Sequence, residues 1–140
     1  MDLKDALKKV GASGLLMAPG DVCLVNDEVV AIPETPDEKR VYHENGRICV
    51  ILSNHELCEK VSMPIVSIAP VSHRVDLKDA CDFPIFPNSK NGLDADSLVM
   101  LGHIQPVRKT DVFKKVGSLQ KAEFDGLMHH LVQNIEGYSD

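Results

Sequence analysis

The sequence contains no tryptophan, and aromatic residues make up only 4% of its 140 residues. Aliphatic side chains must therefore fill most of the core. The scarcity of aromatic rings also disfavours a groove for proline-rich peptides, because such grooves are lined by aromatic side chains. No apolar run is long enough to span a bilayer, and residues 1–5 lack the apolar centre of a signal peptide. These absences predict a cytoplasmic protein without a membrane segment.

Several signatures of catalytic and cofactor-binding sites are also missing. The chain has neither of the glycine-rich loops that bind nucleotide phosphates, no serine nucleophile elbow and no zinc-binding H-E-x-x-H helix. Its four cysteines form no C-x-x-C pair, and its six histidines do not supply closely spaced zinc ligands. We therefore expect no cofactor and no metal ion. Cys23 and Cys49 lie inside apolar runs and are predicted to be buried free thiols.

The net charge of −6 argues against a large nucleic-acid footprint, but the charges are unevenly distributed. Acidic residues dominate from 27 to 44, and basic residues dominate from 108 to 121. Such a chain could carry a local cationic groove, or simply two solvated faces of opposite sign. Charge alone does not decide between these two arrangements.

Two apolar runs, residues 47–53 and 64–74, predict the central strands, because they are rich in β-branched side chains and bounded by turn-forming residues. Polar groups stand at their ends. Arg47 opens the first run, and a serine, a histidine and an arginine at 72–74 close the second. A guanidinium, a hydroxyl and an imidazole at strand ends could bind a phosphate diester and move its protons. These strand ends are therefore the candidate site.

The remaining pattern predicts a small, strongly bent antiparallel sheet, close to a barrel, in a single domain that is mainly β with helices (α+β). Further expected elements are a helix at 2–10, strands at 22–25, 28–32, 82–86 (an edge strand) and 97–101, a loop at 33–45, a helical turn at 56–61, a helix at 110–116 capped by Thr110, and a terminal helix capped by Ser118. The expected apolar stripe of that last helix comprises Leu119, Ala122, Leu127, Leu131 and Ile135.

The order of these segments resembles the MazF/PemK/Kid family of toxin endoribonucleases, the toxins of bacterial toxin–antitoxin pairs. The similarity covers residues 20–135 and leaves 1–19 as an N-terminal helix and connector of the one domain, 1–140. The motifs that carry it are Gly-Asp-Val at 20–22, the arginine-led strand at 47–51, Pro-Val-Ser at 70–72, Asp-Ser-Leu-Val-Met at 96–100 and Lys-Lys-Val-Gly-Ser-Leu at 114–119.

This resemblance implies an SH3-like barrel, a homodimer, and cleavage of single-stranded RNA without a metal ion. In such a reaction the 2′-hydroxyl attacks the adjacent phosphorus and leaves a cyclic phosphate and a 5′-hydroxyl. The recurrent site residues of the family correspond here to Arg47, which would clamp or protonate the phosphate, and Ser72, which would orient it. The implied partners are RNA, a cognate antitoxin protein, and operator DNA through the antitoxin complex.

The chain departs from the family pattern at two places. Ile48 replaces the proline that follows the family's arginine, and residues 102–106 lack the family's late carboxylate and arginine. Because imidazoles can act as acids or bases near neutral pH, His73 and His103 join the two family residues as catalytic candidates. The candidate RNA-binding residues are Arg74, Gln105 and Arg108.

Structural roles for the same residues stay open. Either histidine could simply cap a strand end, Ser72 could serve a turn, and Arg47 could form a surface ion pair. The missing carboxylate and arginine favour an alternative interpretation, a catalytically weak or inactive relative that keeps the barrel as a protein- or DNA-binding regulatory module. An unrelated SH3-like interaction module is the third hypothesis.

Overall fold

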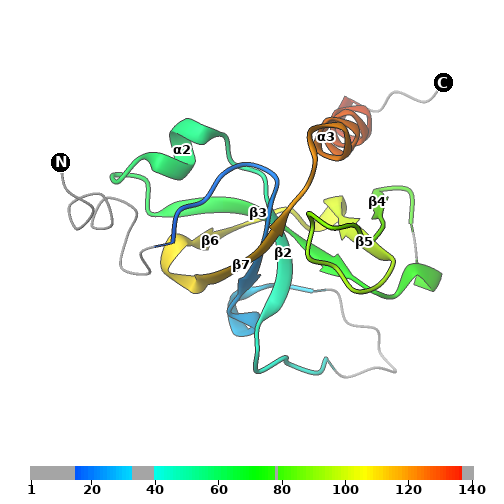
Figure 1. Ribbon diagram of the computed structural model, residues 1–140, viewed down its shortest axis with the longest axis horizontal. Coiled ribbons are helices and arrows are strands. Elements are labelled where there is room, and N and C mark those ends of the chain that lie inside the picture. The colour runs from blue at the N-terminus through cyan, green and yellow to red at the C-terminus, as the bar shows by residue number, and fades with distance from the viewer. Residues whose placement is uncertain (1–14, 33–39, 78, 137–140) are drawn as a thin grey trace.

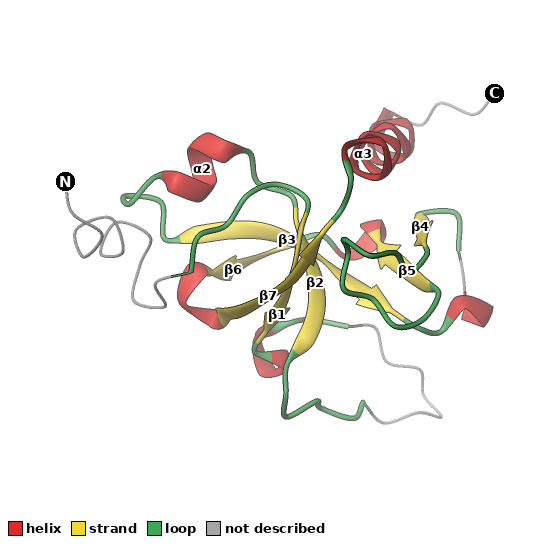
Figure 2. Ribbon diagram, in the orientation of Figure 1, coloured by secondary structure: helices red, strands yellow, loops and turns green. Residues whose placement is uncertain are grey.

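The computed structural model describes residues 15–32, 40–77 and 79–136. In this part of the chain, seven antiparallel strands form a twisted sheet (Figures 1 and 2). The strands are β1 (Asp21–Val25), β2 (Arg47–Ile51), β3 (Ile65–Ser72), β4 (Asp82–Ile85), β5 (Ser97–Met100), β6 (Gln105–Arg108) and β7 (Val112–Ser118). Their spatial order is β4-β5-β3-β2-β1-β7, and β6 pairs with the first half of β3.

The helices are short apart from the last one. The α-helices of the described part are α2 (His55–Glu59) and α3 (Lys121–Glu136), and the 3-10 turns are η1 (Asp27–Val29), η2 (Val75–Leu77), η3 (Leu101–His103) and η4 (Lys109–Asp111). Figure 1 shows α3 beside the β4–β5 end of the sheet and α2 on the side of β3 and β6. Within the described residues, no helix is long and apolar enough to cross a bilayer.

Both faces of the central strands are buried, which explains their nearly continuous apolar sequences. Cys23 and Cys49 belong to the core on one face, together with Cys58 of α2. Val22 and Val50 face the opposite way, into a second core that includes Leu127 of α3. The alternation of side chains along each strand therefore supplies two cores from one sheet.

The predicted fold class is confirmed, since the structure is a bent antiparallel sheet with a C-terminal helix. In the described part the sheet stays open, with β4 and β7 as its two ends, so β4 is the edge strand that its proline predicted. The expected helix at 2–10 and most of the loop at 33–45 lie outside the described residues.

The expected strand at 28–32 is wrong. Asn26 instead caps the 3-10 turn η1, because its side-chain oxygen accepts a hydrogen bond from the Glu28 N–H at 3.2 Å. β1 then takes β2 and β7 as its neighbours, with Cys23 opposite both Cys49 and Lys115. The apolar run at 28–32 has the composition of a strand, but the turn formed by Asn26 takes precedence over it.

The expected helix at 110–116 is also wrong, because residues 112–118 form strand β7 along the open side of β1. The prediction missed β6 as well, where Pro106 stands opposite Ser67. In both places a long-range strand partner outweighs local helix or loop signals.

On α3, Leu127 is buried and Leu131 packs against the core as expected. Ala122 and Ile135 are exposed, and Phe124 and Met128 pack in their stead.

A buried lysine joins β6 and η4 to α2. The Lys109 ammonium donates hydrogen bonds to the carbonyl oxygens of Leu57, Cys58 and Lys60 at 2.8, 3.0 and 3.0 Å. Carbonyls at the end of a helix lack partners within the helix, and a cation there satisfies them and complements the helix dipole. Lys109 therefore fastens α2 to the sheet.

We predict that Lys109→Met lowers the free energy of unfolding by about 2–3 kcal/mol, because it leaves buried carbonyl oxygens without donors. The matched control is Lys60→Met, which changes an exposed lysine of the same region and should cost less than about 0.5 kcal/mol. Urea unfolding of both variants measures the difference. Equal stabilities would show that the ammonium contributes nothing to holding α2.

Candidate functional site

The pairing of β2 with β3 ends two residues short of the two family residues. Its last pair joins Cys49 to Pro70, and Ser72 pairs with Leu98 of β5. Arg47 begins β2 and Ser72 ends β3, so each lies two residues beyond that last pair. Both residues therefore lie toward the same end of the β2–β3 pair.

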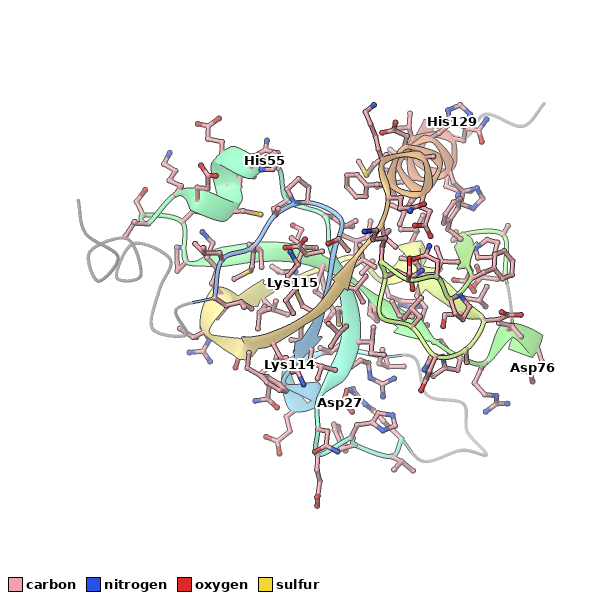
Figure 3. The ribbon with its side chains drawn as sticks, viewed as in Figure 1. Asp27, His55, Asp76, Lys114, Lys115 and His129 are labelled. Carbon is pink, nitrogen blue, oxygen red and sulfur yellow. The ribbon has the colours of Figure 1, made fainter. Side chains whose placement is uncertain are left out.

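A buried carboxylate that we did not predict organises this end of the sheet. Asp27 is 2% exposed, and it lies two residues after the end of β1, where its side chain is labelled in Figure 3. Its Oδ1 accepts a hydrogen bond from Arg47 Nε at 2.7 Å and another from Arg40 Nη2 at 2.5 Å. Its Oδ2 accepts from Arg47 Nη2 at 3.3 Å and from the backbone N–H of His43 at 2.7 Å. We call Asp27, Arg40 and Arg47 the arginine–aspartate cluster.

Hydrogen bonds decide the charge of Asp27. Burial by itself would raise the pKa of this carboxyl group, but the donors from Arg47, His43 and Arg40 outweigh it and lower the pKa from 3.8 to about 2. Asp27 is therefore ionised at neutral pH. Two guanidinium groups facing one carboxylate leave the cluster with a net charge of about +1 at neutral pH.

Arg40 fastens the segment before β2 to this cluster. Its guanidinium donates to the backbone oxygens of Val30 and Asp27, the latter at 2.7 Å, and lies 4.4 Å from the centre of the Tyr42 ring. The ion pair that we considered as a structural role for Arg47 is thus present, but it is buried, not superficial. With 14% of its side chain exposed, Arg47 is oriented by Asp27 and keeps donors for another ligand.

His73 forms a hydrogen bond with Ser97 of β5, and this contact determines which nitrogen of the neutral imidazole carries the proton. His73 Nδ1 lies 2.9 Å from Ser97 Oγ, which itself donates to the carbonyl oxygen of Ala95 at 2.8 Å. A hydroxyl has only one proton, so Ser97 must accept from Nδ1. In the neutral imidazole, Nε2 therefore carries the lone pair, and no partner for Nε2 is seen among the described residues.

Ser72 and Arg74 both contribute to the turn that ends β3. Ser72 Oγ accepts a hydrogen bond from the backbone N–H of Arg74 at 3.1 Å, which is the turn role anticipated for this serine. The guanidinium of Arg74 faces Asp76, with Nε 3.4 Å from Oδ1. Both side chains remain next to the strand end that carries the candidate site.

The other candidates lie further away. Gln105 stands opposite Ile68, and its amide exchanges hydrogen bonds with the backbone of Ala31 at 2.7 and 2.9 Å. His103 lies half-buried in η3, close before it. Arg108 stands opposite Ile65, seven residues before Ser72, which corresponds to about 23 Å along a strand. The structure therefore does not bring Arg108 to Arg47 and Ser72.

Metal-ligating and thiol chemistry have no candidate site in the described part of the chain. No group of three or more His, Cys, Asp or Glu residues there could hold a metal ion. The predicted burial of Cys23 and Cys49 is confirmed. Burial raises the pKa of the Cys23 thiol to about 12 and also raises that of Cys49, so neither is a thiolate at neutral pH.

Comparison with known protein families identifies the architecture. Residues 20–135 match the family described as PemK-like, MazF-like toxin of type II toxin–antitoxin system. The chain belongs to this family. The resemblance inferred from segment order is thereby confirmed, while no curated protein sequence is similar enough to match the chain.

Solved structures of MazF toxins share the fold. The toxin MazF-mt6 of Mycobacterium tuberculosis is 17% identical, with a TM-score of 0.60 over 86% of this chain and 99% of that one. The MazE–MazF complex (Form-II) of Deinococcus radiodurans gives 12% identity and a TM-score of 0.62 over 89% and 99%. An endoribonuclease from Mycobacterial species gives 11% identity and 0.61 over 87% and 93%. At such identities the likeness establishes the MazF-like fold.

We predict that Asp27→Asn lowers the free energy of unfolding by about 3 kcal/mol at neutral pH, because it leaves two buried guanidinium groups without their anion. Since the pKa of Asp27 falls from 3.8 to about 2 on folding, the wild-type ion pair contributes about 2 kcal/mol that is complete above pH ~4 and disappears as the pH falls toward ~2. Unfolding measured across this pH range should show a steeper loss for wild type than for the variant.

Asp76→Asn is the matched control, because Asp76 also pairs with an arginine but 66% of its side chain is exposed. An exposed pair contributes less than about 1 kcal/mol, so this variant should keep nearly the wild-type stability and pH profile. Indistinguishable behaviour of the two variants would contradict the central role of Asp27.

Proposed function

We propose that this protein is a toxin endoribonuclease that cleaves single-stranded RNA without a metal ion, as one half of a toxin–antitoxin pair. Family membership supports the class of activity. The observation that carries the proposal for this chain is the arginine–aspartate cluster at the start of β2, where the buried Asp27 orients the guanidinium of Arg47. A preoriented guanidinium in a cluster of net positive charge is suited to a phosphate diester.

The reaction assigns a separate task to each group. The 2′-oxygen of a ribose forms a bond to the adjacent phosphorus, while the bond from phosphorus to the 5′-oxygen breaks. Arg47 stabilises the charge that develops on the phosphoryl oxygens and hydrogen-bonds to the leaving oxygen, which takes its proton from solvent. Ser72 orients the phosphate from the opposite strand. The products are a cyclic phosphate and a 5′-hydroxyl.

The proton of the 2′-hydroxyl needs an acceptor, and we assign it to His73. Its contact with Ser97 leaves Nε2 as the atom with the lone pair, which is the requirement for a general base. His73 stands just after the end of β3 with its ring against Ser97 of β5, whereas His103 lies in η3, between β5 and β6. His73 thus takes the task of the carboxylate that this chain lacks.

The comparisons also suggest partners. One solved structure with this fold is a complex of MazE with MazF, and another is described as an endoribonuclease. By analogy, we assign to this chain a cognate antitoxin, assembly as a homodimer, and contact with operator DNA through the antitoxin complex. A toxin that acts on cellular RNA works in the cytoplasm.

A catalytically weak relative with a regulatory role is the second candidate. The specific observation in its favour is the sequence of residues 102–106, which lacks the family's carboxylate and arginine. Gln105 in this stretch is bound to the backbone of Ala31 and is not directed at the site. Activity measurements separate the two candidates directly.

We predict that the wild-type protein cleaves a long single-stranded RNA in the presence of EDTA and leaves cyclic-phosphate ends. Arg47→Ala should lower the cleavage rate at least ~100-fold, because it removes the charge that faces the phosphoryl oxygens. Ser72→Ala should lower it by about 10-fold, the value of one hydrogen bond. Arg108→Ala is the control and should stay near wild type, since 76% of this side chain is exposed and it lies at the other end of β3.

The same assay contains the outcomes that exclude each claim. Intact RNA at high protein concentration would reject the enzyme and favour the regulatory module. Cleavage that is lost in Arg108→Ala but retained in Arg47→Ala would locate the site elsewhere on the sheet.

A second prediction concerns the base. His73→Ala should lower kcat/KM by ~100-fold or more, because the general base is removed. Ser97→Ala should cause a smaller loss, about 10-fold, because it removes the hydrogen bond that orients the ring. His103→Ala serves as the control and should keep the wild-type kcat/KM. A wild-type kcat/KM in His73→Ala, or its loss in His103→Ala instead, would refute the assignment.

A further inference from the structure

An exposed phenylalanine stands at the start of β7, close to the arginine–aspartate cluster. The sequence has only four phenylalanines, two tyrosines and no tryptophan, and Phe113 leaves 50% of its surface exposed. Phe113 is one of several large apolar side chains that are exposed in the described part of the chain, and its position beside the cluster makes it a candidate contact for a ligand.

A β-bulge directs this ring away from the regular alternation of the strand. Val112 pairs with Val25, but the next pair along β1 joins Leu24 to Lys114. Phe113 is thus the extra residue between two paired positions. Bulges of this kind bend a strand locally and re-aim a side chain, and they occur frequently next to functional sites.

The re-aimed ring lies on Gly46, the residue directly before Arg47. A Cβ atom at Gly46 would come within 2.6 Å of Phe113 Cζ and 2.9 Å of Cε1, so any other residue there would displace the ring. Gly46 also has a φ angle of +93°, which favours glycine independently. The backbone of Gly46 therefore forms a flat seat for one side of the phenyl ring.

The seat and the cluster belong to the same end of the sheet. Val25, the last residue of β1, pairs with Arg47 on one side and with Val112 on the other. The backbone N–H of Asn26, next to Asp27, donates to the carbonyl oxygen of Asp111 at 2.9 Å. Figure 3 shows Asp27 and Lys114 at this end of β1 and β7. Phe113 is accordingly a neighbour of the residue to which we assign the phosphate.

We propose that Phe113 is a stacking platform for a base of single-stranded RNA, next to the phosphate held by Arg47. This inference rests on the proposed function and extends it to nucleotide binding. Aromatic side chains beside cationic groups hold single-stranded nucleic acids by stacking on successive bases, largely independently of sequence. The bulge and the missing side chain at Gly46 keep the ring in place and leave its outer surface for the base.

The surrounding charges favour an uncharged group on the ring of Phe113. Exposed Glu28 and Glu44 flank the cluster in sequence and oppose the approach of any anion that the guanidinium groups do not hold directly. A nucleobase is neutral and is not repelled. Its phosphate is held by the guanidinium groups, which the buried Asp27 keeps in place.

The absence of tryptophan allows a direct test. Phe113→Trp introduces a single fluorescent reporter, and a short single-stranded oligonucleotide of mixed sequence, with hydrogen in place of each 2′-hydroxyl, binds without being cut. We expect strong quenching of the introduced tryptophan by a stacked base. The matched control is Phe86→Trp, because Phe86 is 60% exposed and follows β4, which forms the opposite end of the sheet from β7. That reporter should not be quenched.

Two more conservative substitutions of Phe113 test the platform without introducing a tryptophan. Phe113→Leu keeps an apolar side chain but loses the π-face, and it should weaken oligonucleotide binding and raise the KM for RNA by about 10-fold. Phe113→Tyr should retain wild-type values. Thermal unfolding of each variant verifies that the fold is intact.

The possible failures are distinguishable. Oligonucleotide binding by fluorescence polarisation without quenching, together with a wild-type KM in Phe113→Leu, would overturn the stacking platform and leave the ribonuclease standing. Quenching by an acidic peptide but not by the oligonucleotide would assign the ring to a protein partner and also overturn it. A wild-type protein that neither binds nor cleaves RNA would remove the proposed function and the platform together.

Discussion

The ionised carboxylate of Asp27 is the constraint on which the rest of the site depends. A charge with so little exposure is strongly unfavourable unless cations and hydrogen bonds compensate it. Here Arg40 and Arg47 supply the cations and His43 a backbone donor, so one side chain joins the end of β1 to the start of β2. The segment that precedes β2 thereby acquires a defined place on the sheet.

The same interaction also orients the guanidinium of Arg47. An exposed arginine would sample many rotamers, whereas Arg47 is held by two hydrogen bonds to one carboxylate and loses little freedom on meeting a phosphate. The second guanidinium ensures that the carboxylate does not cancel the positive charge. Ser97 has a comparable effect on His73, since it selects the nitrogen that carries the lone pair. In both cases a polar neighbour sets the state of a candidate site residue.

The arginine–aspartate cluster and Phe113 lie close together because the sheet aligns the strand ends that carry them. β1, β2 and β7 meet at the level of Val25, which places the arginine–aspartate cluster and Phe113 at one end of the molecule. Apolar side chains fill the two cores on either side of the central strands. The candidate site residues therefore lie where strands end or bulge, as is common for binding sites on rigid scaffolds.

The sequence by itself determined the strands with continuous β-branched runs, the terminal helix, and Arg47 and Ser72 as strand-end residues, because these follow from local pattern and a family's segment order. Only the tertiary structure decided that 112–118 is a strand, since the open side of β1 supplies a partner that local propensity cannot reveal. It also singled out Asp27, Ser97 and Phe113, whose roles arise from residues distant in sequence. Strand register and burial depend on contacts between distant residues, so local sequence patterns could not reveal them.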